Sequence, residues 1–142
     1  MSIIQRIVVL GPFPRGVHCI TKTITEQLPE LHHVGYGIAH LFLQHTSAAL
    51  TLGENTDPDV RADLGEHLER LVPDDLRLYR HSIEGADDAS SHIKSVLVGV
   101  SLSIPIRNGA LALGRWQGIY LCEFRERAGK RSIVVTILGD NQ

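Results

Sequence analysis

The sequence has little cysteine, no long apolar run and no excess of charge of one sign. Cys19 and Cys122 are its only cysteines in 142 residues, so a disulfide framework is not expected, and two reduced thiols are the better interpretation. The longest apolar runs, such as Ile133 to Leu138, are far too short to cross a bilayer. A formal net charge of −2 gives no electrostatic reason to expect nucleic acid or an anionic membrane as a partner.

The first residues, MSIIQRIVVLGPFPRG, lack the long apolar stretch and the small-residue cleavage site of a secretory signal peptide. Together with the two lone cysteines, this favours a cytoplasmic protein. The length, with 43% hydrophobic and 21% charged residues, is ordinary for a globular protein with one core. Because no repeat, linker or low-complexity segment interrupts the chain, residues 1–142 are expected to form one domain.

Three common catalytic motifs are also missing. The chain has no GxxxxGK[ST] phosphate loop, no GxGxxG dinucleotide turn and no GxSxG nucleophile elbow. What it has instead is histidine, eight in all, the side chain most often used for metal ligation and for proton transfer near neutral pH. Histidine-rich surfaces also exist, so the positions of these residues, and not their number, must show whether they form a functional site.

The pattern of residues in the first half predicts strands separated by two helices. Strands are expected over residues 3–10, 16–20, 36–45 and 50–54. A short helix starts near Thr21 and bends at Pro29, and a longer one starts at Asp57–Pro58 and ends at Pro73. The strand over 36–45 is apolar on both faces, so both faces are expected to be covered.

The second half predicts a polar loop, a helix and a run of strands. Residues 74–91 are expected to form the loop, and Ser90 or Ser91 to cap a helix that ends at Gly99. That helix is expected to carry Ile93, Val96 and Leu97 inward. A β-meander should follow over residues 100–106, 110–113, 116–124 and 132–138, with a hairpin turn at Asn108–Gly109. Strands interrupted by isolated helices indicate an α+β fold.

The segment from Tyr79 to His92 concentrates two imidazoles, those of His81 and His92, and three carboxylates. Imidazole with carboxylate suits zinc or another transition metal, and carboxylate with water suits magnesium. The expected helix start at Ser91 also offers free backbone N–H groups to a phosphate. The spacing matches no zinc finger and no HExxH motif, so the segment is a candidate site of unassigned type.

Two further residues are candidates because of the faces on which they lie. His45 ends its strand on the face of Leu41 and Leu43, where a histidine is more often structural than a ligand. Glu123 shares a face with Gln117 and two large apolar residues. Either Glu123 lies in water, paired with Arg125 or Arg127, or it points into a pocket as an acid, a base or a ligand. The remaining histidines are interpreted as structural or surface residues: His18, His32, His33, His40 and His67.

Several ordered motifs in these segments resemble one known family. They are LFLQHTSAALTLGENTDPDVRADL, YRHSIEGADDASSHIKS, VGVSLSIPIRNGALALGRWQGIYLCEFR and SIVVTILGD, and they are similar to the YjbQ family, also called secondary thiamine-phosphate synthase. The resemblance runs from about Gln5 to the C-terminus. It implies an α+β fold of two sandwiched sheets with about three helices, in the order β-β-α-β-β-α-(α) followed by the meander, and a homotrimer.

The resemblance also implies a pocket with three histidines, His45, His81 and His92, as metal ligands. It gives His45, Asp88, Gln117 and Glu123 as catalytic candidates, and Thr46, Asn55, Gly85 and, at the helix start, Ser91 as ligand- or phosphate-binding candidates. Further motif positions fall on Glu54, Asp57 and Glu84. Many relatives read EGNADAH where this chain reads EGADDASSH, so Asp87 or Asp88 is expected to replace the missing Asn.

The family name implies the joining of a hydroxymethylpyrimidine diphosphate to a thiazole phosphate, with release of pyrophosphate. That reaction needs a divalent cation, zinc or magnesium, to neutralise the leaving group. Two alternatives stay open: a trimeric protein that binds a metal or an anion without turnover, and a metal-dependent hydrolase of a small phosphorylated compound or a lactone ester. The physiological substrate does not follow from the sequence.

Overall fold

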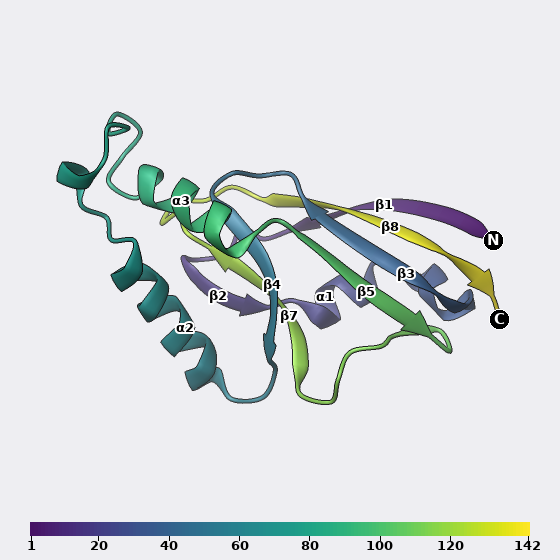
Figure 1. Ribbon diagram of the computed structural model, residues 1–142. Coiled ribbons are helices and arrows are strands. Elements are labelled where there is room, and N and C mark those ends of the chain that lie inside the picture. The colour runs from purple at the N-terminus through teal and green to yellow at the C-terminus, as the bar shows by residue number, and fades with distance from the viewer.

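The computed structural model describes residues 1–142 and contains two antiparallel β-sheets that pack face to face (Figure 1). The five-stranded sheet has the order β1-β8-β3-β5-β6. In that order, the strands span Ser2–Leu10, Arg131–Asn141, Val34–Leu43, Ser101–Arg107 and Ala110–Leu111. The three-stranded sheet has the order β2-β7-β4, from Gly16–Cys19, Gln117–Glu123 and Ala48–Glu54. The helices are α1 (Thr21–Glu26), α2 (Pro58–Leu71) and α3 (Asp88–Val98), with 3-10 turns η1 (Pro29–His33) and η2 (Leu76–Leu78). The expected α+β architecture of two sheets and three helices is confirmed.

The hydrophobic core lies between the two sheets and follows from strand alternation. Ile133, Val135 and Ile137 of β8 face Ile119 and Leu121 of β7, and all five are buried. The segment from α1 through η1 closes one side of this core, as its predicted apolar spacing requires, with Ile24, Leu28 and Leu31. Burying a side chain of this size contributes about 1.5–3 kcal/mol. No helix is long and apolar enough to span a membrane.

The start of α2 is confirmed at the predicted cap. The Asp57 carboxylate accepts a hydrogen bond of 2.9 Å from the N–H of Asp59, and Pro58 occupies the first helical position. The Glu54 carboxylate accepts from the N–H of Asp57, also at 2.9 Å. These two acidic side chains satisfy N–H groups that the helix itself leaves unpaired, which explains their positions in the sequence.

The strands after α3 do not form the expected meander. β5 and β6 form the predicted hairpin at Asn108–Gly109. β7 then crosses to the other sheet and lies between β2 and β4, whereas β8 returns to lie between β1 and β3. The meander was wrong because alternation identifies the buried face of a strand but not the strands beside it. β3 also ends at Leu43, two residues before the predicted end at His45. Only one of its faces is buried, and not both as expected, because no other element covers Tyr36, Ile38 and Phe42.

α3 differs from its prediction in its start and in its faces. It begins at Asp88, so Ser90 and Ser91 lie inside its first turn and do not cap it, while its end at Gly99 is as predicted. Its buried side chains are mostly polar or small: Asp88, Ala89, Ser90, Ser91, Lys94 and Ser95. Ile93, Val96 and Leu97 are instead exposed, Val96 to 83%. Their predicted inward orientation is therefore wrong for the single chain.

Candidate metal centre

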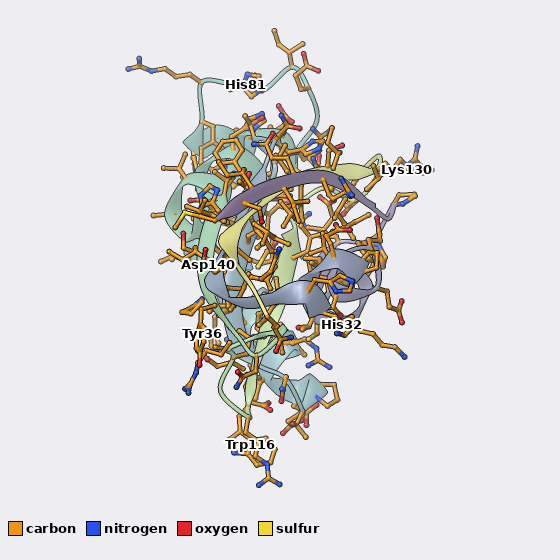
Figure 2. The ribbon with its side chains drawn as sticks, turned by 90° about the vertical axis from the view of Figure 1, so that its right-hand side faces the viewer. His32, Tyr36, His81, Trp116, Lys130 and Asp140 are labelled. Atoms are coloured by element: carbon orange, nitrogen blue, oxygen red, sulfur yellow. The ribbon has the colours of Figure 1, made fainter.

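The loop before α3 and the first turns of that helix bring together three potential metal ligands. His81 Nε2 lies 2.5 Å from Asp88 Oδ2, and His92 Nε2 lies 3.0 Å from the same oxygen. The ligand atoms of these three residues all lie within 4.8 Å of one another. Asp88 and His92 are one helical turn apart, which places both side chains on one face of α3. His81 reaches them from the loop that projects at one end of the molecule (Figure 2).

A backbone carbonyl fixes the orientation of the His92 ring. His92 Nδ1 lies 2.7 Å from the carbonyl oxygen of Thr46, in the segment after β3. Because a carbonyl only accepts, Nδ1 must carry a proton, and in the neutral ring Nε2 is left with the free lone pair. The Nε2 lone pair and the Asp88 carboxylate oxygen would repel each other at this distance. The contact is therefore stable only with a cation between the two atoms or with a proton on Nε2. Orientation of a ligating histidine by a backbone carbonyl is typical of metal sites.

Asp88 is buried and held as a carboxylate by its neighbours. Its Oδ1 accepts a hydrogen bond from Arg125, whose Nε also binds the Asp87 carboxylate at 3.1 Å. Burial alone would raise the pKa of Asp88, but the hydrogen bond with His81 and the charges of His92 and Arg125 outweigh burial and leave that pKa below its usual value. Arg125 thus leaves Oδ2 directed at the two histidines.

His45 lies outside this cluster. The N–H of Ser132 donates to His45 Nε2 at 2.8 Å, and Arg131 Nη1 lies 3.3 Å from Nδ1. Burial and the Arg131 charge lower the pKa of His45, with Glu123 opposing them, so the ring is held neutral. Because its Nε2 lone pair already accepts a hydrogen bond, this conformation does not offer His45 to the metal that His81 and His92 could share.

Glu123 does not lie in water: it is buried, at the edge of the groove between α2 and β2. It is 1% exposed and forms a two-pronged ion pair with Arg131 of the facing sheet, with distances of 2.7 Å to Nε and 2.5 Å to Nη2. Arg131 follows Arg125, Arg127 and Lys130 in a basic stretch of the sequence, and nothing in the local sequence shows that it turns inward. The pair joins β7 to β8 next to His45.

Gln117 and Asn55 lie at the other end of the three-stranded sheet. Gln117 and Glu123 are the two ends of β7, and a strand of this length spans about 20 Å. Gln117 Oε1 accepts from the N–H of Gly114, and Asn55 Nδ2 donates to the carbonyls of Arg115 and Gln117. Figure 2 shows the neighbouring Trp116 at the opposite end of the molecule from His81. The structure does not bring these two residues to the cluster.

The other predicted ligand-binding positions support the cluster through the backbone. Thr46 contributes its carbonyl, as described, and its side chain lies at the groove beside His92. The Ser91 hydroxyl is buried and donates to the carbonyl of Asp88 at 2.5 Å, so it is not free for a phosphate. Gly85 has a φ of 107°, which favours glycine, and its carbonyl accepts from the N–H of Asp88. The exposed Glu84 accepts a hydrogen bond from Arg125 through its backbone carbonyl at 3.3 Å.

A groove of about 750 Å³ opens beside the cluster, between α3 and the ends of β3 and β5. Its walls include the apolar Phe42 and Val96, and its polar lining residues are Gln44, His45, Thr46, His92 and Ser95. A pocket of this size with few polar groups is typical of small-molecule sites. His45 and His92 therefore line one groove, although only His92 belongs to the metal cluster.

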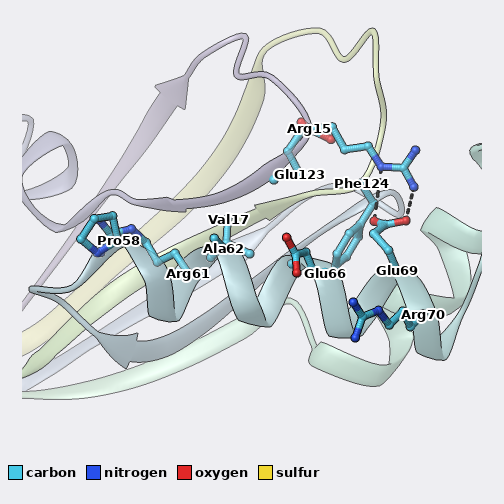
Figure 3. A pocket seen from close by; sticks show the side chains of 12 residues that line it. Arg15, Val17, Pro58, Arg61, Ala62, Glu66, Glu69, Arg70, Glu123 and Phe124 are labelled. Carbon is cyan, nitrogen blue, oxygen red and sulfur yellow. Dashed lines mark hydrogen bonds and ion pairs between the residues drawn. The ribbon is translucent and has the colours of Figure 1, made fainter.

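A second groove, of about 740 Å³, lies between α2 and β2 (Figure 3). Its Arg15 is already paired, with Glu69 and with Asp74, and the pairing with Asp74 and Glu69 raises the pKa of Arg15 although burial opposes it. This groove has no cluster of metal ligands, whereas His92 of the cluster lines the first groove.

Comparison with known proteins finds relatives that match nearly the whole length of this chain. Residues 6–140 match the family model described as UPF0047 protein YjbQ-like. The UPF0047 protein YjbQ of Salmonella typhimurium is 52% identical over 96% of this chain and 98% of its own, and that of Escherichia coli O157:H7 is 46% identical over the same shares.

Solved structures show the same fold. A conserved hypothetical protein from Thermus thermophilus superposes with a TM-score of 0.78 at 34% identity, covering 95% of this chain and 99% of that one. A YbjQ-like protein of unknown function from Sulfolobus solfataricus gives 0.83 at 22% identity, covering 98% and 99%; at that identity the likeness concerns the fold alone. The names of these relatives give no activity. The chain therefore belongs to the YjbQ family of UPF0047 proteins.

Proposed function

We propose that this protein is a metal-dependent enzyme that acts on a small phosphorylated molecule in the groove beside His92. The observation that carries the proposal is the convergence of two imidazole Nε2 atoms on one oxygen of a buried carboxylate. A bound divalent ion would supply Lewis acidity at a phosphate oxygen. The protein would work in the cytoplasm as a homotrimer.

The donor set favours a transition metal such as zinc over magnesium. Two nitrogen donors and one carboxylate oxygen suit zinc and the other late first-row ions, whereas magnesium prefers oxygen donors and water. His81 and His92 are partly exposed while Asp88 is buried. The cluster is therefore open on its outer side, where a substrate oxygen could approach, as at catalytic zinc sites.

The first reaction to test is the synthase reaction that the family resemblance implies. In that reaction a thiazole nitrogen forms a bond to the methylene carbon of the pyrimidine, and pyrophosphate leaves with the electrons of the broken carbon–oxygen bond. The groove would hold the flat rings against Phe42 and Val96, and the cluster would hold the diphosphate. His45, whose two ring nitrogens face Ser132 and Arg131, would line the groove beside these rings.

A hydrolase is the second candidate, because the partly exposed cluster is as accessible to water as to an organic acceptor. Water would then attack the phosphorus of a phosphate ester or the carbonyl carbon of a lactone, and the ester oxygen would leave as an alcohol. A screen of phosphate esters and lactones separates the two, since the synthase proposal expects no hydrolysis of either. A protein that binds metal and pyrophosphate but turns over nothing would instead be the binding protein considered from the sequence.

The metal proposal predicts that untagged protein retains about one zinc-like ion per chain. Asp88→Asn, His81→Ala and His92→Ala should each weaken zinc affinity by at least about tenfold, because each removes one ligand. His67→Ala is the matched control, since His67 lies exposed on α2, away from the cluster. Competition with a chromogenic chelator and elemental analysis measure both quantities.

Pyrophosphate affinity and thiamine-phosphate formation should fall in the same three variants and remain in His67→Ala. If the variants bind zinc as the wild type does, the cluster is a hydrogen-bonded pair of protonated histidines around Asp88, and the metal proposal is wrong. His45→Ala should retain zinc, because His45 lies outside the cluster.

A further inference from the structure

The groove beside the metal centre runs along α3 from the cluster toward the start of β5. Hydrogen bonds between its two walls fix this direction. At one end, His92 Nδ1 donates to the carbonyl of Thr46 at 2.7 Å. At the other end, here called the far end, the N–H of Leu43 donates to the carbonyl of Val100 at 2.8 Å. All four residues line the groove, so it begins at a metal ligand and leads away from it.

The length of the groove follows from the helix that forms one of its walls. The α3 residues that line it are His92, Ser95, Val96 and its C-cap Gly99. Their spacing of i, i+3, i+4 and i+7 places all four on one face of the helix. From His92 to Gly99 the helix rises by about 10 Å. A phosphate bound at the cluster would therefore leave most of this length for the rest of the ligand.

The polar side chains of the groove lie toward the metal centre. Thr46 and His92 meet at that end, and His45 and Gln44 precede Thr46 on the same wall. Ser95 follows His92 by almost one turn of α3. A few hydroxyl, amide and imidazole groups in a pocket typically orient the polar part of a ligand. This end therefore suits the anionic group of a substrate.

The far end of the groove is apolar. Its lining there consists of Phe42, Leu43, Val96, Gly99 and Val100. The N–H of Leu43 and the carbonyl of Val100 satisfy each other, so these two backbone groups need no polar atom from a ligand. Phe42 and Val96 are 43% and 83% exposed. A ligand that covers them removes apolar surface from water, which favours binding of a hydrocarbon group.

Charge is also confined to one end of the groove. None of the lining residues is Lys, Arg, Asp or Glu, whereas the metal centre at one end includes the carboxylate of Asp88 and would hold a cation. A second anionic group at the far end would lose its hydration without gaining a charged partner, which weakens binding. A ligand that fits this groove therefore carries its negative charge at one end only.

We infer that the substrate is a phosphate ester whose only anionic group binds at the metal centre and whose uncharged, apolar body lies along the groove to its far end. The inference rests on the function proposed above and names the class of molecule for that site. Of the two candidate reactions it favours hydrolysis of a phosphate ester. The synthase reaction brings phosphate on both of its substrates, whereas the groove provides a cation for such a group at one end only.

Calorimetric titration of the zinc-loaded wild type with simple phosphates tests the inference. The probes are inorganic phosphate, ethyl phosphate, hexyl phosphate and the bisphosphate of hexanediol. Affinity should rise at least about tenfold from ethyl to hexyl phosphate, because each fully buried methylene raises affinity about fourfold. The heat-capacity change of binding should become more negative over the same step. The bisphosphate should bind at least about tenfold more weakly than hexyl phosphate, because its second phosphate meets the apolar far end.

A cation placed in the groove should reverse this preference. Val96→Lys adds a positive charge to the lining and should raise the affinity for the bisphosphate at least about fivefold. Leu97→Lys is the matched control, because it adds the same charge to an exposed residue of α3 that does not line the groove. Both variants are compared in the zinc-loaded form, and circular dichroism verifies that they fold. The series of probes on the wild type needs no variant.

Three results would count against the inference, and a fourth against its basis. Equal affinities for ethyl and hexyl phosphate would overturn it, and so would a bisphosphate that binds the wild type as tightly as hexyl phosphate does. A bisphosphate affinity no higher in Val96→Lys than in Leu97→Lys would show that the body of the ligand does not lie along the groove. If the zinc-loaded protein binds none of the probes, inorganic phosphate included, the function proposed above is wrong and the inference falls with it.

Discussion

Glu123 and Arg131 show how a single residue pair holds the end of the sandwich beside the groove. Both side chains are at least nine-tenths buried, and the two residues belong to different sheets. Arg131 also approaches His45 and donates to the carbonyl of Ser47 at 3.3 Å. A buried carboxylate is therefore matched by a guanidinium whose donors are used in several directions, as burial of charge requires.

Removing one charge of this pair should destabilise the protein strongly. We expect Glu123→Gln to lower the free energy of unfolding by about 3–5 kcal/mol, because the Arg131 charge is then buried without its partner. The double variant Glu123→Leu, Arg131→Met should recover most of this loss, since it buries no charge. Urea denaturation measures both. A loss under about 1 kcal/mol in the single variant would show that the pair is hydrated in solution.

The two cysteines differ in reactivity because their surroundings differ. Cys19 is exposed, whereas Cys122 is fully buried beneath α2, and burial raises the pKa of its thiol to about 12. Only a thiolate attacks a disulfide reagent. We therefore expect Cys19 to react rapidly at pH 8 and Cys122 to react only in denaturant.

Raising the pH to 9 should not release the second thiol, because that pH is still far below the pKa of Cys122. The rapid phase should disappear in Cys19→Ser, which is the control. Two rapidly reacting thiols per wild-type chain would mean that α2 moves away from β7 in solution.

At the scale of elements, α2 attaches to the rest of the molecule although none of its side chains is fully buried. Ion pairs of one of its residues, Glu69, contribute to this attachment. Glu69 of α2 binds Arg15 and also the fully buried Lys94 of α3, at 2.6 Å. Lys94 Nζ in turn lies 5.0 Å above the ring of Phe124. The polar side of α3 thus faces inward partly because it receives the acidic side of α2.

Two glycines in the helical segments should respond in opposite ways to alanine. At Gly65, within α2, an added Cβ would meet only Val17, at an ordinary 3.7 Å, so Gly65→Ala should stabilise the protein by about 0.5–1 kcal/mol. Gly99, at the end of α3, has a φ of +105°, and Gly99→Ala should cost at least about 1 kcal/mol. Thermal and urea unfolding compare the two. Equal effects of the same sign would contradict this backbone argument.

At the scale of the whole molecule, the two ends of the sandwich have different roles. The chain termini lie together at one end of the five-stranded sheet, and α3 lies at the other (Figure 1). The metal cluster, the groove, His45 and the pair Glu123–Arg131 all gather toward the α3 end.

The sequence by itself determined the features that depend on near neighbours along the chain. These are the alternation of side chains along the strands, the Asp57–Pro58 start of α2, the hairpin at Asn108–Gly109 and the stop at Gly99. Each follows from a local rule of alternation, capping or turn geometry. The density of imidazole and carboxylate from His81 to His92 was visible for the same reason.

Only the tertiary structure decided which distant groups meet. It placed the carbonyl of Thr46 on His92, 46 residues away, and it paired Glu123 with the guanidinium of Arg131 and not with that of Arg125. It separated His45 from the metal cluster and left Gln117 at the far end of β7. It also turned the apolar side of α3 outward, while the inward side packs on β4 and places Lys94 and Asp88 against Glu69 and Arg125. Such contacts depend on how strands and helices are ordered in space, and periodicity along one segment carries no information about that order.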